Sequence, residues 1–209
     1  MPLVTYYSDT HNTQVFLWHI VEDYQYFSSK LSLSQTLTQE LEQMIPKRRL
    51  EWILPRYMLT VIAGTNPPVY QKDKHGKPHL KDSTTSISIS HSGQYLALIK
   101  SDVSCGIDVQ KLTKSIHSIR HKFTDDKELE LFTSRKVPTP LHIIWSSKEA
   151  IFKCYGRRKV SIKSDIAITA VKNNRELKGS LQTPESVLHY DLFNIPLNGY
   201  TLVYALKYH

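Results

Sequence analysis

The sequence predicts an α+β protein of two similar α/β halves in a pseudo-twofold arrangement, each a small, mostly antiparallel sheet packed against one long helix. Two helical patterns with an aromatic and basic edge lie at residues 47–64 and 141–156. Each is followed by a loop and then by strand-like segments that end in a hairpin, at residues 86–100 and 186–207. Because the same order of elements occurs twice, we expect the halves to meet near residues 101–104.

The chain has 209 residues, enough for one large domain or two small ones. We expect an N-terminal subdomain at residues 1–102 and a C-terminal subdomain at residues 103–209. The net charge of +8 indicates an anionic partner: nucleic acid, a phosphorylated small molecule, an acidic protein or a membrane surface. The sequence has no secretory signal pattern and no run of about 18 apolar residues, so we expect a cytoplasmic protein with no membrane segment.

The two cysteines, Cys105 and Cys154, fit reduced and packed thiols and lack the partners of a zinc site. A catalytic thiol at Cys154 stays open as a minor alternative.

The first half is expected to contain a strand, two short helices and one longer helix, at residues 14–21, 22–30, 35–44 and 46–64. Ser34 or Thr36 is the expected cap of the third of these elements. Pro55 should kink or divide the long helix. Arg49 and Arg56 share one face of it, as an anion-binding rim or as an ordinary solvated edge.

A polar loop follows, in which residues 75–78 (HGKP) form a turn that presents Lys77. Residues 86–92 (SISISHS) carry serine at every second position, with Ile87 and Ile89 on the other face, before a Gly93-Gln94 turn, which predicts a hairpin. Ser90 and His91 should lie near its tip, where a histidine is more often a plain surface residue.

In the second half, residues 104–110 predict a strand with Cys105, Ile107 and Val109 on one face, and Gly106, Asp108 and Gln110 on the other. Aspartate is disfavoured inside a strand, so Asp108 needs a turn, a cation or a metal as its partner. A helix should begin at Thr124 as its cap, with Glu128 in the first turn. Further strands are expected at residues 160–171, 186–193 and 200–207.

The helix at residues 141–156 has Thr139 as its expected cap, Pro140 in the first position and Gly156 as its stop. Lys148 falls inside its apolar arc, where an ammonium must reach water or meet an anion. Glu149 and Lys153 are four residues apart and could be only a surface ion pair.

The alternative to that surface pair is a site made with Asp108. Two carboxylates from different elements can hold an octahedral Mg²⁺ that keeps waters and bridges substrate phosphates, while lysines balance the remaining phosphate charge. Asp108, Glu149 and the nearby Lys153 supply such a set.

At this point several segments resemble the 4′-phosphopantetheinyl transferase family, and within it the surfactin-synthetase-activating type of two similar halves. Residues 106–109 (GIDV) look like the family's G-[IV]-D-[IV] segment. Residues 145–156 (WSSKEAIFKCYG) look like its W-[ST]-x-K-E-[AS]-x-x-K-x-x-G segment. Similar matches occur, in the family's order, at residues 89–92 (ISHS) and 76–78 (GKP) and at the basic helix with Arg48, Arg49 and Arg56.

The resemblance implies that the phosphopantetheine arm of coenzyme A is transferred to a serine of an apo acyl or peptidyl carrier protein, with release of adenosine 3′,5′-bisphosphate. It implies catalytic roles for Glu149, Lys153 and Asp108, and Mg²⁺ bound by Asp108 and Glu149, with Gln110 a weak or water-mediated ligand. The implied coenzyme A contacts are Arg49, Arg56, Lys77, Pro78, Ser90, His91, Lys148 and Lys153. The basic helix and loop would bind coenzyme A in the first half, and the metal would lie in the second.

Gln110 stands where many members of the family carry a second acid, and its carboxamide brings no charge. A non-catalytic relative that binds coenzyme A or a nucleotide is therefore the main alternative. A basic nucleic-acid-binding protein is a weaker one, because no recognised binding signature accompanies the charge. We expect a monomer with an acidic carrier protein as its partner, and neither nucleic acid nor membrane.

Overall fold

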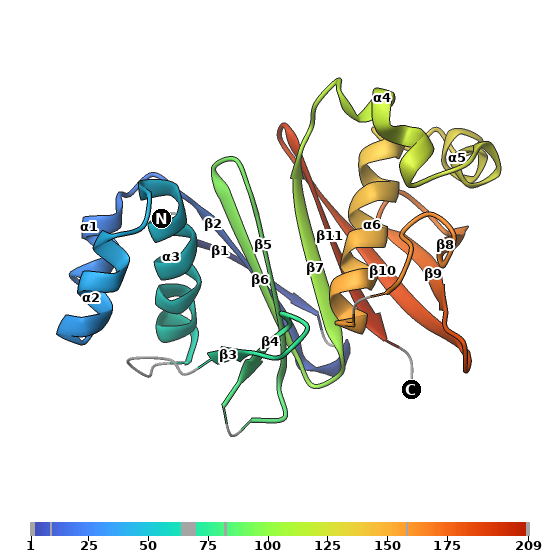
Figure 1. Cartoon of the computed structure of the whole chain (residues 1–209). Coiled ribbons are helices and arrows are strands. Elements are labelled where there is room, and N and C mark those ends of the chain that lie inside the picture. Colours follow the sequence, from blue (N-terminus) through green and yellow to red (C-terminus); the bar gives the residue numbers. More distant parts are fainter. Residues whose placement is uncertain (1–2, 9, 64–69, 82, 158, 208–209) are drawn as a thin grey trace.

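The computed structural model describes residues 3–8, 10–63, 70–81, 83–157 and 159–207. Within these residues the strands form a six-stranded sheet of order β1-β2-β6-β5-β4-β3 and a five-stranded sheet of order β7-β11-β10-β9-β8, with all pairings antiparallel. The sheets lie between two helical layers, with α3 on one outer side and α6 on the other (Figure 1). The mixed α+β architecture with antiparallel sheets is as predicted.

The first sheet and its helices come from the first half of the chain. Their bounds are β1 Leu3–Ser8, η1 Thr10–Asn12, β2 Thr13–His19, α1 Tyr24–Ser28, α2 Gln35–Glu42, α3 Pro46–Ala63, β3 Tyr70–Lys72, β4 Pro78–Leu80, β5 Ser86–Ser92 and β6 Tyr95–Ser101. Helix α3 continues through Pro55 as one element, so of the two expected effects, a kink or a division, the division does not occur. Ser34 caps α2 as expected, because its side chain accepts the Leu37 N–H.

The second sheet and its helices come from the second half. Their bounds are β7 Cys105–Lys111, α4 Ile116–Ile119, η2 Arg120–Lys122, α5 Asp126–Thr133, α6 Pro140–Tyr155, β8 Ile166–Val171, β9 Glu176–Gln182, β10 Val187–Leu197 and β11 Tyr200–Lys207. The prediction missed β1, β4 and β9, and it began the strand that is β8 six residues too early.

One predicted helix cap is wrong, and one is confirmed in position but lacks a capping hydrogen bond. Helix α5 is capped by Asp125, whose side chain accepts the Glu128 N–H, and not by Thr124. Thr139 precedes α6 as expected, but it has a left-handed backbone and makes no side-chain capping bond to any described residue. The stop at Gly156 is confirmed, with a positive φ of 69° that glycine adopts without strain.

Three apolar clusters hold the layers together. One lies between α3 and the first sheet and includes Phe27, Ile53 and Leu98. Another lies between α6 and the second sheet and includes Ile144 and Leu192. The cluster between the two sheets takes residues from both halves of the chain, among them Val15, Ile99, Ile107, Val109 and Leu202. The halves therefore share a core, so their relative position is fixed by buried apolar contact.

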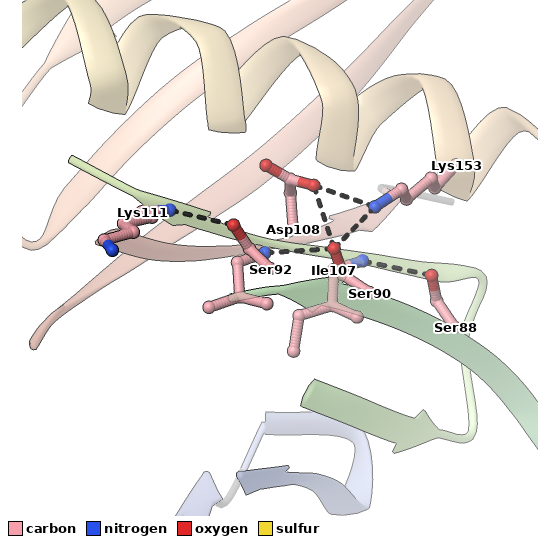
Figure 2. Close-up of polar contacts among 8 residues, drawn as sticks. Ser88, Ser90, Ser92, Ile107, Asp108, Lys111 and Lys153 are labelled. Atoms are coloured by element: carbon pink, nitrogen blue, oxygen red, sulfur yellow. Dashed lines mark hydrogen bonds and ion pairs between the residues drawn. The ribbon is translucent and has the colours of Figure 1, made fainter. Parts of the chain in front are cut away.

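Strands β5 and β7 run side by side and are joined by serine side chains. The Oγ atoms of alternate β5 residues accept N–H groups of alternate β7 residues at 3.0–3.2 Å, in the pairs Ser86–Cys105, Ser88–Ile107, Ser90–Val109 and Ser92–Lys111. Figure 2 shows the Ser88–Ile107 and Ser92–Lys111 bonds. We call these four bonds the serine ladder. On its other edge β7 pairs with β11. The ladder therefore satisfies donors at an edge of the second sheet.

Among the described helices, none combines the length and the apolar character that crossing a membrane requires.

Candidate active site

Helix α6 packs closely on the face of β7 that carries Gly106, Asp108 and Gln110. A side chain at Gly106 would collide with the main chain of Ala150 and Cys154, so only glycine permits this approach. The predicted alternation of β7 thus turns Asp108 toward the helix that carries Glu149 and Lys153. The structure brings these three side chains together, although Asp108 lies more than 40 residues before the other two in sequence.

Asp108 is the centre of the cluster and is only 6% exposed. Its Oδ1 accepts hydrogen bonds from Lys153 Nζ at 2.8 Å and from Ser90 Oγ at 3.0 Å (Figure 2). Its Oδ2 is buried and has no hydrogen-bond partner among the described residues. A buried carboxylate oxygen without a partner is costly, so this atom is suited to a ligand that the protein itself does not supply.

Glu149 lies half-buried on α6 beside this cluster. Burial raises the pKa of its carboxyl group above the usual range, the nearby charge of Asp108 raises it further, and Lys153 opposes both effects. Two carboxylates thus face one ammonium, which leaves a net negative charge at the site. A divalent cation would remove this excess.

The residues present fit a magnesium site with two protein carboxylates. Asp108 offers an Oδ2 without a partner among the described residues. Glu149 offers a carboxylate whose ionised form is disfavoured by burial and by the charge of Asp108. The described residues include no group of three or more His, Cys, Asp or Glu side chains that could hold a metal. Mg²⁺ commonly takes one or two carboxylates and completes its octahedron with water and substrate phosphates, so a third acid is not required. Gln110 is half-buried two residues beyond Asp108 on β7.

A cavity of about 190 Å³ opens beside Lys153, between α6 and the turn that precedes β4. Lys77, Pro78, Phe152 and Arg157 line it together with Lys153. Lys77 donates to the Cys154 carbonyl at 2.5 Å, where its charge also complements the C-terminal end of α6. The cavity therefore joins a turn of the first half to the helix of the second.

His91 points to the other side of β5, as alternation along the strand requires. It lines a second cavity, of about 340 Å³, with Lys47 and Glu51 of α3. Its Nδ1 lies 4.0 Å from Glu51 Oε1, and burial lowers the pKa of the imidazole. His91 thus lies apart from Ser90, its neighbour in sequence, although both belong to one predicted segment.

The two arginines of α3 are engaged within the first half. Arg49 donates to the carbonyls of Glu42 and Met44, at 3.0 and 3.1 Å, and so holds the end of α2. Arg56 donates to the Tyr70 hydroxyl, and its guanidinium lies 3.5 Å from the ring centroid of Trp52. These contacts engage both guanidinium groups within the first half, although Arg49 Nε is buried without a partner among the described residues.

Lys148, which the resemblance implied as a coenzyme A contact, is buried inside the second half. Lys148 is 1% exposed, and its Nζ pairs with Glu128 Oε2 at 2.9 Å. Glu128 also accepts hydrogen bonds from Thr124 Oγ1 at 2.8 Å and from the Ile168 N–H at 2.7 Å. The helical pattern placed Lys148 correctly in the apolar arc, but the anion that it meets there comes from α5.

Cys154 is unsuited to nucleophilic catalysis. Burial raises the pKa of its thiol to about 12, and its Sγ donates to the Ser104 carbonyl at 3.2 Å. The reactive thiolate is therefore suppressed at neutral pH.

Sequence reasoning missed two features of the site. Glu128 was seen only as part of a capping pattern, and the serines of β5 only as one side of an alternating strand. The serine at every second position was a usable signal, because it marks a polar face on a strand whose other face is apolar.

No curated protein matches the chain. Residues 104–205, which run from the start of β7 into β11, match the family model of the 4′-phosphopantetheinyl transferase superfamily. This stretch contains Asp108, Glu149 and Lys153. The match and the geometry of these three residues together support a 4′-phosphopantetheinyl transferase superfamily domain in the second half of the chain.

Proposed function

We propose that the protein transfers the 4′-phosphopantetheine group of coenzyme A to a serine of an apo acyl or peptidyl carrier protein. The serine oxygen forms a bond to the phosphorus that carries the pantetheine arm, and adenosine 3′,5′-bisphosphate leaves with the oxygen of the broken diphosphate bond. The observation that carries the proposal is the partnerless Oδ2 of Asp108 beside Glu149 and Lys153, within the stretch that matches the superfamily.

Glu149 is the proposed general base. Its raised pKa increases its affinity for a proton, as removal of the proton of the carrier serine requires. The half-exposed position on α6 lets a hydroxyl approach it directly or through a water.

Lys153 is the proposed partner of the leaving phosphate. An ammonium has three N–H donors, and two of these go to Asp108 and Ser90. The third can meet a phosphate oxygen in the adjoining cavity, where Lys77, Pro78 and Arg157 would receive the rest of the diphosphate. Mg²⁺, held by Asp108 and Glu149 with Gln110 through water, would neutralise the diphosphate and stabilise its charge during transfer.

The remaining coenzyme A contacts need revision. We keep His91 as a proposed contact of the nucleotide in the second cavity, and we leave out Arg49, Arg56 and Lys148 because each is engaged inside its own half.

We further propose two subdomains at residues 1–102 and 103–209, related by a pseudo-twofold axis as in the surfactin-synthetase-activating type. The net charge of +8 favours an acidic carrier protein as the partner. We propose that the protein acts as a monomer in the cytoplasm.

The test is the intact mass of an apo carrier protein after incubation with the purified protein, coenzyme A and Mg²⁺. We expect the carrier to gain the mass of one phosphopantetheine group, and the gain to disappear when EDTA replaces Mg²⁺.

A non-catalytic coenzyme A-binding relative is the second candidate, favoured by the uncharged Gln110 beside Asp108. It predicts calorimetric binding of coenzyme A without any gain in mass on several carrier proteins. That combination would reject the transferase and retain the binding site.

A further inference from the structure

Ser90 is the residue at which the serine ladder meets the candidate metal site. Its Oγ accepts the Val109 N–H at 3.2 Å and Lys153 Nζ at 2.9 Å, and it donates to Asp108 Oδ1 at 3.0 Å (Figure 2). The residue is 7% exposed. We propose that Ser90 is a positioning residue that holds the Asp108 carboxylate so that Oδ2 faces the metal, an inference that rests on the proposed function.

The hydrogen-bonding capacity of the Ser90 hydroxyl argues against the direct coenzyme A contact that the family resemblance implied. A serine hydroxyl has one hydrogen to donate and two lone pairs to accept with. The three contacts of Ser90 use all of this capacity. A phosphate or an adenine could bind the Ser90 hydroxyl only by displacing a protein contact.

In the same set of contacts, one carboxylate oxygen of Asp108 binds protein donors and the other is left for a ligand. Oδ1 takes both protein donors, from Ser90 and Lys153, while Oδ2 has no partner among the described residues. The terminal torsion of an aspartate is broad, so one donor alone would not fix the carboxylate plane. Without the Ser90 hydroxyl, the carboxylate could turn and present both oxygens to Lys153, which would compete with a metal for Oδ2.

The ladder supplies a matched control. Ser90 and Ser92 each accept one N–H group of β7, at 3.2 and 3.0 Å. The Ser92 hydroxyl accepts the Lys111 N–H, whereas the Ser90 hydroxyl accepts the Val109 N–H and also donates to Asp108. Replacing either serine by alanine removes one bond of the ladder, so a difference between the two variants reports the contacts that Ser90 makes with Asp108 and Lys153.

The experiment measures Mn²⁺ binding by electron paramagnetic resonance, without coenzyme A or carrier protein. In Ser90→Ala we expect the Mn²⁺ dissociation constant to rise about 10- to 100-fold, the usual effect of losing the residue that orients a metal ligand. Ser92→Ala should bind Mn²⁺ as the wild type does. Ser90→Thr keeps the hydroxyl and should retain the affinity. Thermal unfolding of each variant checks the fold, and Ser90→Cys, with its weak donor, replaces Ser90→Ala should the latter not fold.

Three results would overturn the inference: a wild type that does not bind Mn²⁺, equal affinity in Ser90→Ala and wild type, or an equal loss in Ser92→Ala. Loss of coenzyme A affinity in Ser90→Ala with unchanged Mn²⁺ affinity would also reject it, in favour of direct contact. A protein that binds Mn²⁺ through Ser90 yet modifies no carrier would refute the proposed function alone. A transferase whose Mn²⁺ affinity is independent of Ser90 would refute only the positioning role.

Discussion

Replacing Lys148 by methionine separates two roles for this lysine, a buried ion-pair partner or a phosphate contact. The structure gives it the first role, because its ammonium lies 2.9 Å from Glu128 in a site where the lysine is 1% exposed. Methionine fills much of the same volume without the charge. The variant therefore removes the partner of a buried carboxylate while changing the packing little.

The expected loss of stability in Lys148→Met follows from the buried Glu128 carboxylate, which loses its ion-pair partner. Removing one member of a buried ion pair costs about 3–5 kcal/mol, because the other charge stays desolvated without compensation. Glu128 keeps its hydrogen bonds from Thr124 and from the Ile168 N–H, which favours the lower end of that range. The free energy of unfolding of a domain is about 5–15 kcal/mol, so this loss is a large part of the total stability.

Urea unfolding followed by far-ultraviolet circular dichroism measures the effect. Lys148→Met should lower the unfolding free energy by about 3 kcal/mol. The double variant Lys148→Met/Glu128→Gln should lose less than the sum of the two single variants, because it leaves no buried charge at this site. Lys127→Met, on the exposed side of α5, is the control and should change stability by less than about 0.5 kcal/mol.

If Lys148→Met unfolds at the same urea concentration as the wild type, the buried pair of Lys148 and Glu128 does not stabilise the fold. A folded Lys148→Met of unchanged stability that no longer binds coenzyme A would assign the lysine to the phosphate site after all.

Two further predictions concern the packing and the pH dependence of the second half. Gly106→Ala should destabilise the protein by about 1–3 kcal/mol and weaken Mn²⁺ binding, because the added methyl pushes α6 away from β7; unchanged melting and affinity would contradict the close approach. His142 accepts the Thr113 N–H through Nε2, and burial lowers the pKa of its imidazole. As the pH falls below about 6.5, this imidazole is therefore protonated in the unfolded chain before it is protonated in the folded protein. Stability should therefore decrease below that pH, with a shallower slope in His142→Gln; an identical slope in urea titrations from pH 7 to pH 5 would show that His142 does not contribute.

Short-range patterns predicted those features that depend on one element alone. The period of two along β7 turned Asp108 to the same side as Gly106, and Gly156 ended α6 where it should. The turn at Gly93 likewise closes the predicted hairpin of β5 and β6. In each case the information lies within a few neighbouring residues.

Features that depend on a partner from elsewhere in the chain could not be predicted in this way. The helical pattern showed that Lys148 needs an anion, but Glu128 lies on another helix, and its side chain is used there and not in a capping box. Arg49 and Arg56 carried the right charge for phosphate, yet carbonyls and aromatic rings of the first half engage them. Strand β9 was missed because its sequence, ELKGSLQ, has few β-forming residues and a glycine at its centre. Beside Gly179, Ile151 of α6 fills the space that a side chain would take.

The central claim is that Asp108, Glu149 and Lys153 form one site for metal-assisted phosphoryl transfer. The most direct test compares carrier modification, by intact mass, between the wild type, Glu149→Gln and the exposed control Glu130→Gln. We predict one phosphopantetheine per carrier with the wild type and Glu130→Gln, and a rate at least about 100-fold lower with Glu149→Gln, which loses the general base at unchanged fold. Normal transfer by folded Glu149→Gln would contradict the claim.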